Sequence, residues 1–293
     1  MYSGRRNTFK VCVLLHCSRM ARQRLGQHFL ADLDWREQIA RAIRVSRQSL
    51  VPSCSDKPYC WIEIGAGHGE MTEHLAATGA PVYAIELDAS LAGRLQHLTQ
   101  QFPSLTVVPG DILQTDIAEI AAGRRVRIYG NLPYYITSPI LHRLFTFADS
   151  IDEMHIVIQE EVAERLTAQP NSKPYGYLSV ATQLYARPEL VFPIPREAFD
   201  PPPEVGSALV TLRFPGEGAK LGEADESKFL DFVKLCFGQK RKTLVNNLRS
   251  IASPDSVRET LERLRLRPDA RAEQLSPSLL SALHRQLESQ PHG

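Results

Sequence analysis

The chain has 293 residues, of which 43% are hydrophobic and 23% are charged. It is long enough for a full α/β domain plus a smaller one, and its composition is ordinary for a soluble globular protein. No apolar run approaches the roughly 18 residues of a membrane span. The five cysteines are odd in number and form no C-x-x-C pair. The sequence therefore predicts no membrane anchor, disulfide framework or metal site, and we expect a cytoplasmic protein.

The N-terminal region precedes the first predicted strand. Residues 1–19 match no later pattern, whereas Met20 leads directly into the first recognisable motif. We expect residues 1–21 to be a leader that is either untranslated or disordered, with a mitochondrial-type presequence as the alternative. Asp32 is then expected to cap an amphipathic helix over residues 35–45.

A strand, a glycine turn and a helix follow in that order. Residues 59–64 form an apolar run typical of a buried strand, which leads into a turn containing Gly65 and Gly67 and then into a helical pattern over 70–77. This order is typical of a Rossmann-like unit, in which glycines let the backbone pass close to a ligand.

Two more strand ends carry carboxylates. Residues 82–85 form the next strand and end at Glu86, about 20 residues beyond the first glycine, where a carboxylate can hold both hydroxyls of a ribose. Residues 105–108 form a third strand followed by Asp111, which can accept from an adenine amino group while Ile112 packs on the base. The turn lacks pyrophosphate-binding spacing and no Walker lysine is present, so a nucleoside without phosphates, such as S-adenosylmethionine, is the better ligand.

A fourth strand, over 126–130, ends in the tetrapeptide Asn131-Leu132-Pro133-Tyr134. The Asn131 amide oxygen and the Leu132 carbonyl can accept hydrogen bonds from a flat amine. Pro133 leaves no N–H to compete, and Tyr134 offers a ring on which a nucleobase such as adenine can stack. Each group alone is equally well explained as a loop acid or a proline turn, but four such strand ends at one sheet edge favour a ligand site.

The rest of this domain continues the α/β pattern. Helices are expected over 140–147 and 178–184, and strands over 154–158, 188–192 and 208–214. The polar segment 163–177 predicts a surface loop able to close over a substrate. Phe199, in the proline-stiffened loop 199–207, is either a second stacking plate opposite Tyr134 or a plug in the core, and the pattern alone does not decide.

The C-terminal part has a helical pattern throughout. We expect a domain over 22–215, a linker over 216–227 rich in Gly, Glu and Ala, and a helical domain over 228–293. Its helices are expected over 228–237, 242–251, 256–264 and 276–288. Lys240, Arg241 and Lys242 lie among basic residues that can hold an anionic polymer, although a solvated helix face explains any one of them.

Several of these stretches resemble one family. They are GQHFL at 26–30, EIGAG at 63–67, ELD at 86–88, GD at 110–111, the tetrapeptide, F-x-P-x-P-x-V-x-S at 199–207, and F-x-x-K-R-K-x-L-x-N-N-L at 237–248. From about Arg24 to Leu287 the chain is similar to the KsgA/RsmA ribosomal RNA adenine dimethyltransferases, which are related to the Erm resistance methylases and the mitochondrial transcription-factor B proteins. The resemblance implies a Rossmann-like class I methyltransferase with a seven-stranded, mostly parallel sheet and a small all-α C-terminal domain.

The resemblance also implies a reaction and a site. S-adenosyl-L-methionine would donate two methyl groups in succession to N6 of each of two adjacent adenosines, in the 3′-terminal hairpin loop of 16S rRNA in the 30S subunit. We expect a monomeric enzyme of ribosome biogenesis that needs no metal. The expected cofactor site comprises His28, Leu30, Gly65, Gly67, Glu86, Leu87, Asp111, Ile112 and Asn131. The tetrapeptide would be catalytic, Tyr134 and Phe199 would hold the adenine, and Lys240, Arg241 and Lys242 would bind RNA. The family often has Asn where this chain has His28, and an imidazole can still hydrogen-bond.

Two alternatives stay open. An Erm-like enzyme would methylate 23S rRNA; the basic C-terminal helices and the complete loop over 199–207 favour the small-subunit reading. A non-catalytic RNA-binding assembly factor or transcription factor could share the fold. Intact Glu86, Asp111 and Asn131 argue against lost chemistry, and cofactor binding would discriminate.

Overall fold

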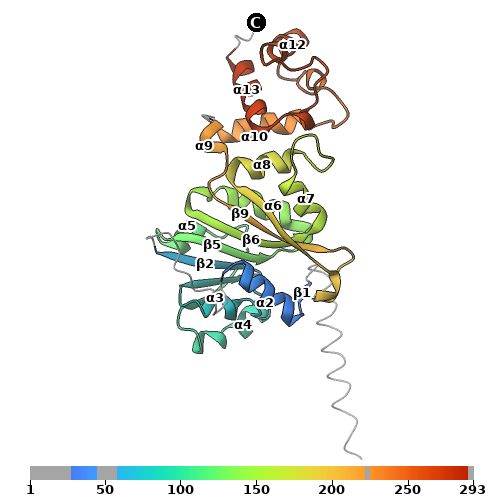
Figure 1. The fold of residues 1–293 in the computed structure, drawn as a ribbon. Coiled ribbons are helices and arrows are strands. Elements are labelled where there is room, and N and C mark those ends of the chain that lie inside the picture. Colours follow the sequence, from blue (N-terminus) through green and yellow to red (C-terminus); the bar gives the residue numbers. More distant parts are fainter. Residues whose placement is uncertain (1–27, 45–57, 222–224, 290–293) are drawn as a thin grey trace, which may run out of the picture.

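The computed structural model describes residues 28–44, 58–221 and 225–289, without the side chains of residues 219 and 220 (Figure 1). The expected leader, the start of the motif at 26–30 and the segment 46–57 lie outside the described residues.

A seven-stranded sheet organises the fold, in the order β4-β3-β2-β5-β6-β9-β7. The first five strands in this order run parallel, and β9 runs antiparallel to both β6 and β7. The prediction of a seven-stranded, mostly parallel sheet is confirmed. The strands are β2 (Tyr59–Ile64), β3 (Val82–Glu86), β4 (Leu105–Pro109), β5 (Arg125–Asn131), β6 (Ile151–Gln159), β7 (Arg187–Ile194) and β9 (Ser207–Arg213).

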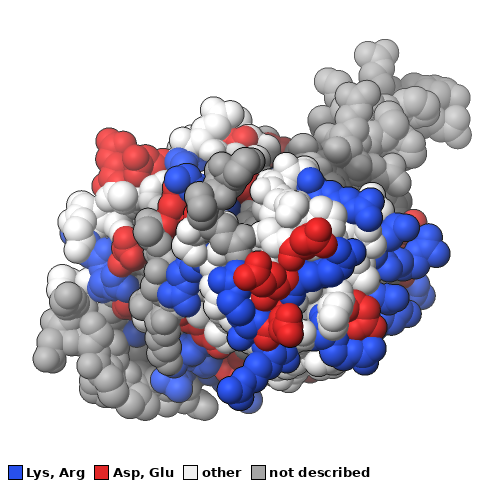
Figure 2. All heavy atoms as spheres, turned by 90° about the horizontal axis from the view of Figure 1, so that it is seen from above, with Lys and Arg blue, Asp and Glu red and all other residues white. Residues whose placement is uncertain are grey.

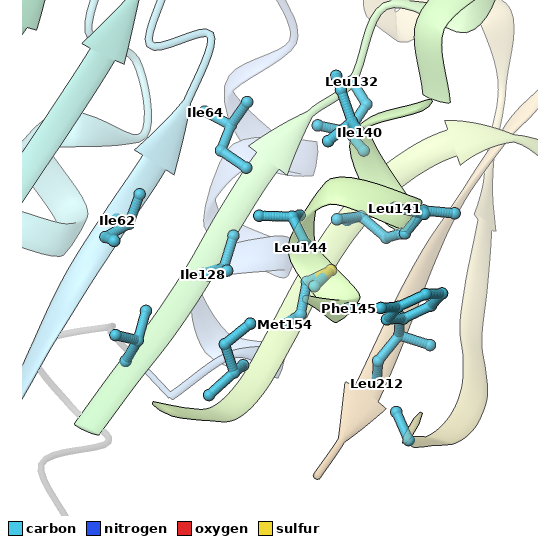
Figure 3. Close-up of a cluster of buried hydrophobic side chains, with 14 of the residues drawn as sticks. Ile62, Ile64, Ile128, Leu132, Ile140, Leu141, Leu144, Phe145, Met154 and Leu212 are labelled. Carbon is cyan, nitrogen blue, oxygen red and sulfur yellow. The ribbon is translucent and has the colours of Figure 1, made fainter. Parts of the chain in front are cut away.

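Helices cover both faces of the sheet, which explains why the central strands are apolar on both sides. On one face, Trp61 packs in a core shared with α2, α3 and α4, while its neighbour Ile62 points to the other face, which α5, α6 and α7 cover. Figure 3 shows Leu141, Leu144 and Phe145 of α6 lying over the strands. The helices are α2 (Leu33–Ala42), α3 (Thr72–Ala76), α4 (Ala89–Leu95), α5 (Ile117–Ala121), α6 (Thr137–Phe145), α7 (Glu160–Thr167) and α8 (Tyr177–Tyr185).

The C-terminal helices form a third core together with α8. Phe229, Leu261 and Leu283 are fully buried there with Tyr175. The helices are α9 (Gly218–Leu221), α10 (Glu226–Cys236), α11 (Leu244–Asn247), α12 (Pro254–Arg263) and α13 (Pro277–Glu288). The helix expected over 242–251 is shorter than predicted, and the division into two domains stays a prediction. None of the described helices is long and apolar enough to cross a membrane.

The prediction of a surface loop over 163–177 is wrong. Helix α7 continues to Thr167, because Ala163 and Leu166 form a short apolar stripe that is buried between polar neighbours. The following segment packs against the C-terminal helices: the fully buried Tyr175 donates its hydroxyl to the Leu275 carbonyl at 2.8 Å. This segment therefore joins the sheet to the C-terminal helices and does not hang free over a site.

A second, two-stranded sheet lies beside the main one. It pairs β1 (Phe29–Leu30) with β8 (Phe199–Asp200) in antiparallel fashion. The Ala198 carbonyl also accepts from the N–H groups of Ala31 and Asp32, at 2.8 and 3.1 Å. This pairing brings His28 and the proline-rich loop together.

Candidate active site

The site residues meet at the carboxyl ends of β2, β3 and β5 and just beyond β4, as expected for an open α/β sheet. Two adjoining hollows lie there and share Gly65 and Pro133. The carboxylate hollow is lined by residues that include Glu86, Leu87, Asp111, Ile112 and Tyr135. The tetrapeptide hollow is lined by His28, Phe29, Gly65, Gly67, Asn131, Leu132, Pro133 and Tyr134.

The glycine turn needs glycine for two reasons. Gly65 and Gly67 have φ angles of +68° and +59°, in the left-handed region that side chains rarely adopt. A Cβ on Gly67 would lie 2.9 Å from Cε1 of Phe29, whereas a Cβ on Gly65 would meet only the Asn131 carbonyl oxygen, at 4.0 Å. The turn is thus packed on its Gly67 side and open to the hollows at Gly65.

Glu86 braces this turn from the end of β3. It is 2% exposed, and its two oxygens accept from the N–H groups of Gly67 at 2.8 Å and Asp88 at 2.9 Å. Each carboxylate oxygen can accept two hydrogen bonds, so Glu86 can hold the turn and still accept from a ligand hydroxyl.

The rest of the carboxylate hollow combines one acid with apolar walls. Asp111 is oriented by the Leu113 N–H, which donates to its Oδ1 at 2.9 Å, and Ile112 is buried beside it. Leu87 and Tyr135 are 56% and 59% exposed at this hollow. Tyr135 is the aromatic residue that sequence reasoning missed, although it directly follows the tetrapeptide.

Asn131 is held in one orientation by its amide nitrogen. Nδ2 donates to the backbone carbonyl of His28 at 2.8 Å. A carbonyl oxygen can only accept, so the nitrogen must face His28, and Oδ1 is left to accept from a group in the tetrapeptide hollow. The amide acceptor expected at this position is therefore available.

The ring of Tyr134 is held at two places. Its hydroxyl forms a 2.6 Å hydrogen bond with Oγ of Ser207, and its ring stacks on His28 with a centroid distance of 5.4 Å and an interplanar angle of 27°. The Nδ1–H of His28 in turn donates to the Pro201 carbonyl at 2.7 Å. Burial raises the pKa of Tyr134, and the bond to Ser207 partly offsets this rise.

Two expected site residues lie in the core. Leu30 and Phe199 are 5% and 3% exposed, belong to the same core cluster, and line neither hollow. Phe199 thus fills the core, as the second of the two alternatives for this residue describes. The ring that stacks on Tyr134 belongs to His28. Sequence pattern did not reveal this because the contact depends on the β1–β8 pairing.

The basic residues expected to bind RNA lie apart from the hollows. Lys240, Arg241 and Lys242 are exposed between α10 and α11, and Lys240 donates to the Lys173 carbonyl at 2.6 Å. Figure 2, which looks down on the C-terminal helices, shows Lys and Arg interleaved with Asp and Glu over this end of the molecule. The described residues contain no group of three or more His, Cys, Asp or Glu placed to hold a metal ion.

Glu63 is a buried acid beneath the site that sequence reasoning did not assign. It is 2% exposed and accepts from the Thr72 hydroxyl at 2.5 Å. Burial raises its pKa to about 8; the Thr72 bond opposes this rise, and the nearby Glu70 and Glu86 add to it. Glu63 therefore carries a proton at neutral pH.

The chain matches known proteins along most of its length. The family described as "Ribosomal RNA adenine dimethylase" matches residues 18–288. A ribosomal RNA small subunit methyltransferase A from Koribacter versatilis is 36% identical over 277 residues, covering 90% of this chain and 93% of the relative. One of the same name from Acidobacterium capsulatum is 41% identical over 229 residues, covering 78% and 81%.

Solved structures show the same fold. A dimethyladenosine transferase from Plasmodium falciparum has a TM-score of 0.71 at 22% identity, covering 87% of this chain and 96% of that one. The 23S rRNA methyltransferase ErmE has a TM-score of 0.67 at 25% identity, covering 89% and 100%. From the family match and the relatives we conclude that this chain belongs to the ribosomal RNA adenine dimethylase family, enzymes that use S-adenosyl-L-methionine as methyl donor.

Proposed function

We propose that this chain dimethylates N6 of two adjacent adenosines in the 3′-terminal hairpin loop of 16S rRNA, in the 30S subunit. The observation that carries the proposal is the bond from Asn131 to His28, which leaves the amide oxygen available for an amine in the tetrapeptide hollow. The names of the relatives, small subunit methyltransferases, support the choice of RNA.

The carboxylate hollow fits the methyl donor. A nucleoside needs acceptors for its ribose hydroxyls and its amino group, and Glu86 and Asp111 would supply them while Ile112 and Leu87 contact the base. The open side of Gly65 leaves room for a ligand that runs from this hollow into the other. When bound, S-adenosyl-L-methionine supplies a methyl group on a positively charged sulfur.

The tetrapeptide hollow would prepare the adenine nitrogen. The exocyclic nitrogen of adenine is a poor nucleophile because its lone pair is delocalised into the ring. Hydrogen bonds to Oδ1 of Asn131 and to the Leu132 carbonyl favour a pyramidal nitrogen whose lone pair is free to attack. Pro133 presents no N–H that would compete, so these residues act by positioning and electrostatics.

RNA would be held mainly by its phosphates. Three basic residues, Lys240, Arg241 and Lys242, are exposed. They can pair with the phosphates of an RNA backbone whatever its base sequence. The ring of Tyr134 would then select an unpaired base, because a base that is paired in a helix cannot reach this ring. We propose that the enzyme works in the cytoplasm as a monomer acting on the 30S subunit.

Methylation of purified particles tests the proposal. Unmodified 30S particles from a strain lacking its own enzyme should gain methyl groups from labelled cofactor, and mapping should find them on two adjacent adenosines near the 3′ end. Labelling of 23S rRNA instead would favour the alternative suggested by the likeness to ErmE. Failure to bind S-adenosylhomocysteine would point to a non-catalytic RNA-binding protein.

A further inference from the structure

Ser207 is a fully buried residue at the start of β9, and its hydroxyl lies 2.6 Å from that of Tyr134. We propose that Ser207 is a positioning residue that holds the Tyr134 ring at a fixed tilt, so that the ring receives the target base. This inference rests on the proposed function, and it gives a role to the last residue of the F-x-P-x-P-x-V-x-S stretch.

The sheet fixes Ser207 from both sides. It pairs with Gln159 of β6 on one side and with Ile194 of β7 on the other. Next to it, the Gly206 carbonyl accepts from the Glu160 N–H at 3.0 Å. A hydroxyl delivered from the interior of a sheet has little freedom, so its hydrogen bond defines where the Tyr134 oxygen must lie.

His28 holds the same ring from one face. A base inserted between two rings separates them by about 7 Å, twice the 3.4 Å rise of stacked bases. The 5.4 Å between the His28 and Tyr134 centroids leaves no room for a base. The target base therefore takes the other face of Tyr134, and His28 and Ser207 together keep the ring from turning.

A double-mutant cycle isolates the hydroxyl contact. Tyr134→Phe keeps the ring and removes its hydroxyl, Ser207→Ala removes the partner, and the third variant combines the two changes. Ser179→Ala is the matched control, because Ser179 is also fully buried and its hydroxyl donates to the Arg165 carbonyl at 2.6 Å, and neither residue lines the two hollows. If Ser207→Ala fails to fold, Tyr134→Phe still tests the bond from its other end.

Three readouts separate positioning from a loss of structure. They are the single-turnover methylation rate, the affinity for S-adenosylhomocysteine, and the fluorescence of a hairpin RNA with 2-aminopurine at the target adenosine, which reports stacking. We expect each single variant to lower the rate roughly five- to tenfold and to change the fluorescence, with cofactor affinity unchanged. The double variant should be no slower than either single one.

The opposite results overturn the inference. Wild-type rate and fluorescence in Ser207→Ala, additive losses in the double variant, or an equal loss of cofactor affinity would each show that Ser207 does not act through Tyr134. A wild-type protein that gives no fluorescence change and no methylation would instead overturn the proposed function.

Discussion

The side-chain nitrogen of Asn131 donates to the backbone carbonyl of His28 at 2.8 Å and so joins two segments 103 residues apart. The bond links the end of β5 to the residue before β1. It has two effects, because it sets which end of the Asn131 amide faces the hollow and it holds the N-terminal segment against the tetrapeptide. A substitution at Asn131 therefore removes an acceptor and loosens a wall of the hollow.

Asn131→Ala should lower the turnover rate far more than it weakens RNA binding. Loss of an aligned acceptor in a water-poor pocket is expected to cost on the order of 10²–10³ in rate, whereas RNA affinity depends mainly on phosphate contacts. Single-turnover methylation at saturating RNA and cofactor measures the rate. A wild-type rate in this variant would exclude the tetrapeptide as the catalytic centre.

Glu86→Ala should weaken binding of S-adenosylhomocysteine by roughly ten- to a hundredfold, as expected for loss of a charged acceptor. The affinity would fall for a second reason. The Gly67 N–H donates to this carboxylate, so the substitution also removes a hydrogen bond that holds the glycine turn. Calorimetry gives the affinity, and Glu73→Ala, which changes an exposed acid on α3, is the control. Equal affinity in both variants would remove Glu86 from the site.

Gly67→Ala should destabilise the turn more than a similar change elsewhere. Gly67 and Gly79 both have positive φ, at +59° and +79°, but an added Cβ meets Phe29 at 2.9 Å at Gly67 and nothing within 4 Å at Gly79. Both variants should carry about 1 kcal/mol of backbone strain, and only Gly67→Ala should add a packing loss and weaker cofactor binding. Urea unfolding measures the stability of the two variants, and calorimetry measures their affinity for the cofactor. Equal stability and equal affinity in the two variants would contradict the role given to the turn.

Glu63→Gln should flatten the pH dependence of stability. Burial raises the pKa of Glu63 from 4.5 to about 8 in the folded protein. Between these values the folded chain holds a proton that the unfolded chain has released, so the free energy of unfolding falls as the pH rises. The loss should be on the order of a few kcal/mol between pH 5 and pH 8.5. Urea unfolding at several pH values would show the same slope in both proteins if Glu63 were not buried as a neutral acid.

Arg241→Ala and Lys242→Ala should weaken RNA binding and flatten its salt dependence, with the slope falling by roughly one for each phosphate that is no longer neutralised. Lys240→Ala should differ, because Lys240 also donates to the Lys173 carbonyl and its removal loosens the segment after α7. Salt titrations of binding to a hairpin RNA separate the three. If the salt dependence of RNA binding is unchanged in all three variants, RNA binds at another surface.

Elements defined by their own residues are predicted well from the sequence. Strand β2 has the bounds predicted for it, because a run that is apolar except for Glu63 ends directly at glycine. Helix α7 is not predicted, because its two buried residues are outnumbered by polar ones.

The site divides in the same way. The groups at the strand ends are predictable, since parallel strands bring their carboxyl ends to one edge. The partners of Tyr134 are not, because His28 and Ser207 reach it through pairings between distant segments. Phe199 shows the limit, since a ring in a stiff loop looks the same in sequence whether it faces a ligand or the core.

The segment around α7 connects the tetrapeptide hollow to the C-terminal helices. The N–H of Glu160, the first residue of α7, donates to the carbonyl of Gly206, which precedes the Tyr134 partner Ser207. After α7, the hydroxyl of Tyr175 donates to the Leu275 carbonyl among the C-terminal helices. These hydrogen bonds link the residues around Tyr134 to the C-terminal helices through one segment of the chain. Under the proposed function, the protein would select an adenosine in two ways. One is the chemistry of the base, and the other is the distance between that base and the phosphates that the C-terminal residues bind.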